Sequence, residues 1–144
     1  GADIEFSMQN SLVYAAWQDD TLSPGTWTVM YRRSADNGAT WSGIRSLSSP
    51  WPQEGWSACQ PSLAAFNDKV LVAWSDVTQG RSVINTAFSQ DCGDRWLYQR
   101  ISDLEQSSVS DPSASAAGVE GFAVFWSGIQ AGRWDIFCRS RAVK

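Results

Sequence analysis

The 144-residue sequence contains no histidine, and this absence removes several kinds of catalytic site. Ser-His-Asp triads, Cys-His pairs and histidine-based metal sites all need an imidazole, which titrates near neutral pH and binds metals. The three cysteines, Cys59, Cys92 and Cys138, lack the short spacing of a zinc site, and an odd number cannot all pair, which favours a reducing compartment. The sequence therefore predicts neither a metal site nor a cofactor.

The sequence is also poor in positive charge and in long apolar runs. Lys and Arg number 11 against 15 Asp and Glu, so the formal charge of -4 does not favour nucleic acid as a partner. No apolar run approaches the roughly 20 residues that cross a bilayer, and residues 1–10 lack the basic flank and apolar stretch of a signal peptide. We therefore expect a soluble protein that binds neither nucleic acid nor membranes.

Tryptophan, in contrast, is abundant, with nine residues, and its positions reveal an internal repeat. Three apolar stretches end in tryptophan, at Trp17, Trp74 and Trp126. The first two are followed by similar octets, "SADNGATW" at 34–41 and "SQDCGDRW" at 89–96, and "DIFCRS" aligns Ser140 with Ser34 and Ser89. The shared order and spacing predict three units, at about residues 1–48, 60–103 and 111–144.

Each unit has the pattern of four short β-strands. In the second unit the pattern predicts strands over 61–66, 69–74, 82–89 and 96–102, with Asn, Asp and Gly at the turns between them. The second strand of each unit is almost wholly apolar, as expected of a strand that is buried on both faces. Four antiparallel strands in about 50 residues describe a propeller blade. We therefore predict an all-β fold, a β-propeller portion of about three four-stranded blades.

The number of blades is too small for a closed ring. Propellers have four to eight blades, and the third unit ends at Lys144, before its octet and its last strand. Three blades alone would expose two large apolar sheet faces. We expect either that two chains complete a six-bladed ring as a homodimer, or that the sequence is a fragment of a longer protein.

The residues of the two octets all have local structural roles in a turn. An Asp can accept hydrogen bonds from the turn's own N–H groups, a Gly can take positive φ, and a Trp can cover the turn. This favours a structural role over a ligand site. The residues concerned are Ser34, Asp36, Gly38, Thr40 and Trp41 in the first octet and Ser89, Asp91, Gly93 and Trp96 in the second.

The octets resemble the Asp-box, or bacterial neuraminidase repeat, of the sialidase-like β-propellers. The first octet matches the pattern S-x-D-x-G-x-T-W in full, and the second has Arg95 where Thr is usual. The resemblance extends over essentially the whole chain. It implies a secreted protein in which the octets lie on the outer rim of the propeller, on the side opposite the ligand pocket.

Alternating strand directions place two kinds of loop on that opposite face, namely the loops between second and third strands and the linkers between units. Within the linker before the second unit, Trp51 and Trp56 offer apolar surface for a sugar ring, with Glu54 and Asp20 as nearby acceptors. Alternatively, both tryptophans fold back and cap the blade.

Four further residues belong to the same predicted face. Asp19 and Asp76 each follow the tryptophan of a second strand by two residues and would either bind ligand or cap a turn. Arg81 and Arg133 precede the third strands of successive units. They would contact an anionic group or remain solvated or paired with a carboxylate.

The resemblance also suggests which catalytic residues to seek. Sialidases use an arginine cluster, a Tyr paired with Glu, an Asp and an Arg-Ile-Pro motif, and this sequence has no such motif and no recognisable Tyr–Glu pair. We therefore expect a non-catalytic, lectin-like carbohydrate-binding module. One alternative is a glycoside hydrolase that uses two of the carboxylates on this face, or a fragment of one. The other is an assembly scaffold without a small ligand.

Overall fold

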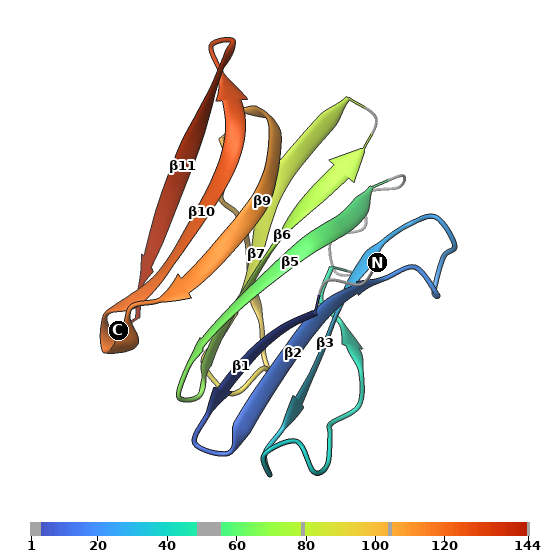
Figure 1. The fold of residues 1–144 in the computed structure, drawn as a ribbon, viewed down its shortest axis with the longest axis vertical. Helices are drawn as coiled ribbons and strands as arrows, with labels where there is room; N and C mark the ends of the chain where they lie inside the picture. The colour runs from blue at the N-terminus through green and yellow to red at the C-terminus, as the bar shows by residue number, and fades with distance from the viewer. Residues whose placement is uncertain (1–3, 49–55, 79, 104, 144) are drawn as a thin grey trace.

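The computed structural model of the protein describes residues 4–48, 56–78, 80–103 and 105–143, which form three antiparallel sheets (Figure 1). The first sheet consists, in spatial order, of β1 (Ile4–Gln9), β2 (Leu12–Asp19), β3 (Thr28–Ser34) and β4 (Arg45–Ser46). The second consists of β5 (Ser57–Phe66), β6 (Lys69–Thr78), β7 (Arg81–Ser89) and β8 (Leu97–Arg100). The third consists of β9 (Ser107–Ala116), β10 (Gly121–Gln130) and β11 (Arg133–Ala142), with a short 3-10 helix, η1 (Gly118–Glu120), between β9 and β10.

The three sheets lie side by side as successive blades, which we call the first, second and third blade (Figure 1). The innermost strand of the second blade, β5, contacts β1 and β2 of the first blade and β9 of the third. The predicted all-β propeller portion, with a third blade that lacks its last strand, is therefore confirmed for the described residues. Among those residues, no helix has the length and apolarity needed to span a bilayer.

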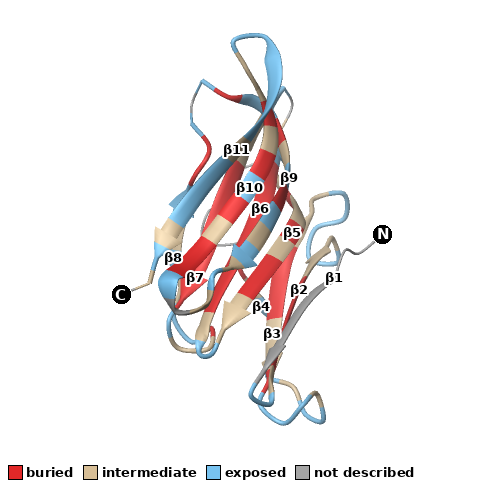
Figure 2. Cartoon of the chain, turned by 60° about the vertical axis from the view of Figure 1, so that its left-hand side comes forward, coloured by how far each residue is buried: buried red, intermediate tan, exposed pale blue. Residues whose placement is uncertain are grey.

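Two clusters of buried side chains hold neighbouring blades together. The first interblade core includes Tyr14, Tyr31, Leu47, Val70, Val72, Trp74 and Ala87. The second interblade core includes Leu71, Phe88, Phe122, Val124 and Trp126. Strand β6 therefore contributes alternate side chains to both cores, as the unbroken apolar pattern predicted. Figure 2 shows that β6 is buried over most of its length.

The inner strands of the second and third blades begin earlier than the sequence indicated. In the second unit we expected the first strand to begin at Pro61, and the third unit carries the same Pro-Ser pair at Pro112. Proline in a sheet is usually confined to a strand's first residue or to a bulge. Instead, β5 and β9 continue across the prolines, and each pairing register shifts there. The residues before the prolines, Gln60 and Asp111, have φ of 55° and 54°, so bulges absorb both prolines.

The third repeat also differs by one residue from its sequence alignment. Across the second and third strands of each blade, Val13 pairs with Ser34, Val70 with Ser89 and Phe122 with Arg141. Arg141, not Ser140, therefore takes the position of the first octet residue in the third blade. The sequence alignment matched serine to serine, whereas the register follows the β10–β11 hairpin, and a slip of one residue exchanges the faces of a strand.

Candidate functional site

The two octets form turns in which the Ser, Asp and Gly residues make the same hydrogen bonds. In the first, Ser34 Oγ accepts a bond from Gly38 N (2.8 Å) and donates one to Asp36 Oδ1 (2.7 Å). Thr40 donates its N–H to Asp36 Oδ1 (2.8 Å) and its hydroxyl to Asp36 Oδ2 (2.5 Å), and Trp41 Nε1 donates to Gly38 O (3.0 Å). These donors, above all Thr40, lower the pKa of Asp36 to about 2.

The second octet keeps the bonds of its Ser and Asp with a different donor, whereas Trp96 Nε1, at the position of Trp41 Nε1, has no hydrogen-bond partner among the described residues. Ser89 Oγ accepts a bond from Gly93 N (2.8 Å) and donates one to Asp91 Oδ1 (2.8 Å). Arg95, at the position of Thr40, donates its N–H to Asp91 Oδ1 (2.9 Å) and its Nε–H to Asp91 Oδ2 (2.9 Å). The pKa of Asp91 is likewise lowered to about 2, mainly by these bonds. The guanidinium thus supplies the second bond that a threonine hydroxyl makes in the first octet.

The first blade holds the turn of the second octet. Tyr31 Oη and Arg33 Nη1 donate to Cys92 O at 2.9 and 2.6 Å, and Arg45 Nη1 donates to Gly93 O at 2.9 Å. An ion pair between Arg33 and Asp94 (3.0 Å) adds to these bonds. The second octet is therefore part of an interblade contact.

On the opposite face, several predicted ligand residues bond within their own loops. Trp51 and Glu54 lie outside the described residues, and Trp56 is half-buried immediately before β5. Asp19, at the end of β2, accepts bonds from the N–H (2.7 Å) and hydroxyl of Thr21, which lower its pKa. Asp20 accepts a bond from Gly25 N (3.3 Å). Asp19 thus caps its turn, the alternative that the sequence left open for it, and Asp20 bonds within the same loop.

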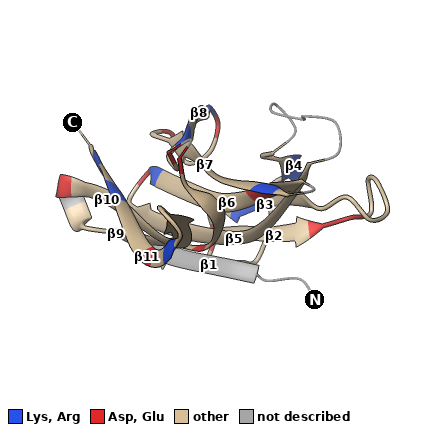
Figure 3. Cartoon of the chain, turned by 90° about the horizontal axis from the view of Figure 1, so that it is seen from above, with Lys and Arg blue, Asp and Glu red and all other residues tan. Residues whose placement is uncertain are grey.

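Arg81 and Arg133 are exposed at the starts of β7 and β11. Neither guanidinium forms an ion pair with a carboxylate of the described residues. Basic and acidic residues occur on all three blades (Figure 3). They are available for an anionic group, but the described residues bring neither of them to Asp19 or Asp76.

Asp76 is not in a loop, which corrects the sequence prediction. The β6–β7 hairpin is paired as far as Thr78 and Arg81, so Asp76 lies within β6 and is only 7% exposed. Its carboxylate accepts bonds from Trp74 Nε1 (3.0 Å) and from Asn85 Nδ2. Burial raises its pKa to about 6 against the opposing effect of these bonds.

The structure brings together a polar group that the sequence did not single out. We call it the inner-strand cluster, and its members are Gln18, Gln60, Ser75, Ser110, Asp111 and Ser127. At its centre, Gln60 Nε2 donates to Asp111 Oδ1 (2.6 Å), while Gln60 Oε1 accepts bonds from Ser75 Oγ (3.1 Å) and Asp111 N (3.3 Å). The cluster thus joins the two bulges on neighbouring inner strands.

The remaining members extend the cluster in both directions. Ser110 Oγ lies 2.9 Å from Asp111 Oδ2 and 3.2 Å from Ser127 Oγ, and Gln60 N donates to Gln18 Oε1 (2.8 Å). Burial, and then the charges of Asp76 and Asp111, raise the pKa of the neighbouring Cys59 thiol. Amide, hydroxyl and carboxylate groups from all three blades therefore meet on the face opposite the octets.

One sequence signal could have identified this cluster. Gln60 and Asp111 both precede Pro-Ser at equivalent positions of successive units. Proline inside a strand indicates a bulge, and bulges redirect side chains at functional sites.

Among the described residues, no three carboxylate or thiol side chains are grouped so that they could hold a metal ion.

Comparisons with known proteins bear on the fold. The chain is similar to a Hadza microbial sialidase over 95% of its length (TM-score 0.68, 11% identity), to an α-L-arabinofuranosidase from Podospora anserina in complex with cellotriose over 96% (0.56, 10%), and to the NanB sialidase from Streptococcus pneumoniae over 99% (0.50, 14%). It spans 34%, 52% and 22% of those chains. No protein-family profile and no curated protein sequence matches it. The structural likenesses establish a sialidase-like fold.

Proposed function

We propose that this protein is a non-catalytic carbohydrate-binding module, and that the inner-strand cluster forms its binding site. The observation behind the proposal is the bonded pair of Gln60 and Asp111, which joins two inner strands on the face opposite the octets. Sugars are bound by a few fixed amide, hydroxyl and carboxylate groups next to apolar surface. The structural neighbours named as sialidase and arabinofuranosidase support a carbohydrate as the ligand class.

Aromatic residues lie close to the cluster in the chain and supply the apolar part of the site. Trp56 is half-buried and precedes β5, whose Ala58 N–H donates to Trp27 O (2.8 Å), so Trp27 and Trp56 lie at the same end of neighbouring blades. An aromatic face packs against the C–H groups of a sugar ring. We keep Trp51 and Glu54 of the preceding linker in the proposed site, with Asp19, Asp20, Arg81 and Arg133 at its rim.

Asp111→Asn should weaken glycan binding by about tenfold, because it replaces a charged hydrogen-bond acceptor by a neutral amide of the same shape. Asn also tolerates the positive φ of this position. Trp56→Ala should weaken binding at least as much if the indole packs on the sugar. A glycan array would identify the ligand, and titration calorimetry would measure both variants.

The control is Asp68→Asn, in the β5–β6 turn at the octet end, where the carboxylate pairs with Lys69 (2.8 Å). The Asp68→Asn variant should bind the glycan with the affinity of the wild type. A wild type that binds no glycan, or an Asp111→Asn variant that binds normally, contradicts the proposal.

Glycoside hydrolysis is the second candidate function, and Asp76 supports it. A carboxyl group with a pKa of about 6 can donate a proton near neutral pH, and both Asp76 and Asp111 act electrostatically on Cys59. Turnover of fluorogenic glycosides, abolished by Asp76→Asn and by Asp111→Asn, would favour the hydrolase over the binding module. Absence of both glycan binding and glycoside turnover would favour the third possibility, a scaffold whose open blade faces serve association.

We also propose that a second copy of the chain covers the outward face of the third blade and completes a six-bladed ring. Three large apolar side chains are exposed on β10 and β11, namely Phe125 (44%), Trp134 (65%) and Ile136 (68%). The neighbouring Phe137 packs inward against the second interblade core, so Trp134 and Ile136 face away from it. In the ring they would meet the outward face of the partner's first blade.

The wild type should therefore sediment as a dimer, and the double change Trp134→Ser and Ile136→Asp should give a monomer, because it removes apolar contact and adds charge. Leu22→Asp, at an equally exposed apolar residue (65%) in a loop of the first blade, should remain dimeric. A monomeric wild type at high protein concentration rejects the ring.

A further inference from the structure

We propose that the carbohydrate site takes an amino sugar, and that the protonated amine of this sugar binds at Asp111 in the inner-strand cluster. This assignment rests on the proposed function and narrows the ligand class from carbohydrates in general to sugars with a free amine. An acidic sugar would be repelled by the same carboxylate.

The serine hydroxyls of the cluster use their hydrogen atoms within the protein. A hydroxyl has one hydrogen to donate and two lone pairs that accept. Ser75 Oγ donates to Gln60 Oε1 (3.1 Å), and Ser110 Oγ donates to Asp111 Oδ2 (2.9 Å). Ser127 Oγ donates to Ser110 O (3.3 Å) or to Ser110 Oγ (3.2 Å). A ligand therefore meets these hydroxyls as hydrogen-bond acceptors.

Asp111 has further capacity to accept, because a carboxylate takes about four hydrogen bonds. Its side chain is exposed and accepts one bond from Gln60 Nε2 (2.6 Å) and one from Ser110. Both donors are neutral, and Asp111 forms no ion pair with a basic side chain of the described residues. A positively charged group with several hydrogens to donate therefore complements Asp111 best.

A second carboxylate with spare acceptors lies next to the cluster. Asp76 follows Ser75 in β6 and accepts bonds from Trp74 and Asn85 with the same oxygen, Oδ2. Asn85 is only 5% exposed, and its Oδ1 has no hydrogen-bond partner among the described residues. No described basic side chain pairs with Asp76. Uncompensated acceptors therefore continue from Asp111 to the neighbouring strand.

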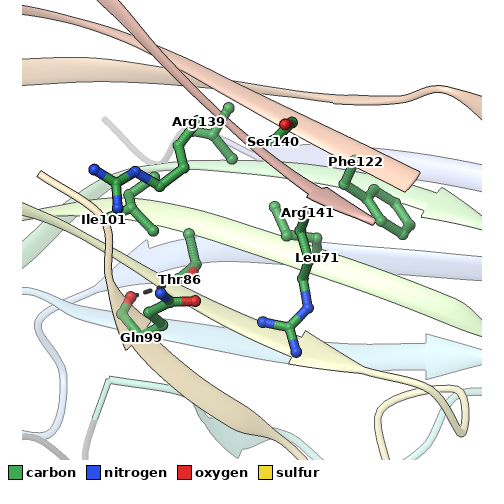
Figure 4. A pocket seen from close by; sticks show the side chains of 9 residues that line it. Leu71, Thr86, Gln99, Ile101, Phe122, Arg139, Ser140 and Arg141 are labelled. Atoms are coloured by element: carbon green, nitrogen blue, oxygen red, sulfur yellow. Dashed lines mark hydrogen bonds between the residues drawn. The ribbon is translucent and has the colours of Figure 1, made fainter. Parts of the chain in front are cut away.

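The basic residues of the sheets lie away from the inner strands. Strands β1, β5 and β9 contain no Lys or Arg, and the second strands contain only Lys69, at the octet end of β6. The arginines of the sheets belong to the third and fourth strands (Figure 3). Two of them, Arg139 and Arg141, line a cavity of about 80 Å³ between the second and third blades, with Leu71 and Thr86 (Figure 4). A ligand at the inner strands therefore meets carboxylates before it meets a guanidinium.

Arg81 and Arg133 share the face of the cluster but begin some distance along it. Each lies three residues before the residue that pairs with a cluster serine, Ser75 or Ser127. Three residues of strand span about 10 Å, which is comparable with the screening length of physiological salt. These exposed arginines therefore leave most of the charge of Asp111 uncompensated.

An ammonium group meets the requirements of the cluster. It carries a positive charge and three hydrogens to donate, and it accepts no hydrogen bond. A hydroxyl at the same carbon has one hydrogen and no charge, and an N-acetyl group has one N–H and adds bulk. Hydrogen bonds between charged groups are the strong ones, so the amine should determine which sugar binds.

Three tetrasaccharides test the assignment, because β-1,4-linked glucosamine, glucose and N-acetylglucosamine differ only at carbon 2. In titration calorimetry at about pH 6, where a sugar amine is protonated, the glucosamine tetramer should bind about tenfold more tightly than the other two. Asp111→Asn should bring the three affinities together. Asp68→Asn, which changes the net charge equally but at the octet end, should retain the preference.

The outcomes separate this assignment from the proposed function. A glucose or N-acetylglucosamine tetramer that binds as tightly as the glucosamine tetramer would reject the amine but support a carbohydrate site. An acidic glycan as the best ligand on the array, or no binding of the glucosamine tetramer up to about 1 mM, would reject the amine as well. A preference that survives in Asp111→Asn would reject Asp111 as the partner of the amine. Only a protein that binds no glycan at all would reject the proposed function too.

Discussion

Gly93→Ala should destabilise the protein by roughly 3 kcal/mol or more, whereas Gly38→Ala, at the equivalent position of the first octet, should cost about 1 kcal/mol. Both glycines have positive φ, 86° and 88°, so both variants carry the same backbone penalty. A Cβ on Gly93 would lie 2.4 Å from Tyr31 Oη and 2.7 Å from two of its ring carbons. At Gly38 the nearest atom is Trp41 Cζ2 at 3.7 Å. Urea denaturation of the two variants would measure the difference.

The cause of this difference can be tested with a third variant. Tyr31 is buried, so its ring cannot withdraw from the new methyl group. Introducing Gly93→Ala into a Tyr31→Leu background should therefore cost little more than Gly38→Ala does, since the clash is gone. If Gly93→Ala and Gly38→Ala lowered the free energy of unfolding equally in the wild-type background, Gly93 and Tyr31 would not be in close contact.

Asp76→Asn should stabilise the protein by about 2–3 kcal/mol at pH 7 and have little effect at pH 4. The pKa of Asp76 is raised from 3.8 to about 6, so the folded state holds this proton more tightly than the unfolded state does. Wild-type stability therefore falls as pH rises from about 4 through 6, and the neutral amide removes this penalty. In addition, Asn85 Oδ1 has no hydrogen-bond partner among the described residues and could accept a bond from the new amide. Thermal denaturation as a function of pH would measure both effects.

Asp36→Asn is the control of opposite sign. The pKa of Asp36 is lowered to about 2, so its carboxylate stabilises the fold above the unfolded pKa of 3.8, and this contribution disappears as pH falls through 2. The Asn variant should therefore be less stable than the wild type at pH 7 and should approach it in acid. A stabilising effect of Asp36→Asn at pH 7, or none for Asp76→Asn, would contradict these assignments.

Features that depend on neighbouring residues could be predicted from the sequence. The apolar second strands and the incomplete third blade followed from periodicity and repeat spacing. In the octets, Ser34, Asp36 and Gly38 form bonds that span at most four residues, so residue type and spacing were enough to indicate the turn. Tight turns of this kind are determined largely by their own side chains.

Features that depend on distant pairing could not be predicted in this way. Gln60 and Asp111 are 51 residues apart, and only the packing of two inner strands brings them together. Asp76 was predicted to lie in a loop because the apolar run ends at Trp74, whereas the β6–β7 hairpin stays paired as far as Thr78. The position of Arg141 was missed because the repeat was aligned by residue type, which does not reveal the register of the strands. Strand pairing is set by cross-strand contacts, which a single sequence does not display.

The contact between the second octet and the first blade is one-sided, because one blade supplies the donors and the next blade supplies the turn. This affects how a further blade could be added by gene duplication. Tyr31, Arg33 and Arg45 hold the turn of the blade that follows them in the chain. Strand pairing places Cys138 and Ser140 of the third blade where the first blade has Tyr31 and Arg33, so a unit that followed the third blade would find neither donor for its turn. A copy of the first blade placed before the first blade would instead bring its own Tyr and Arg to the turn at Gly38. Tandem copies are therefore easier to add at the amino-terminal side, one blade at a time.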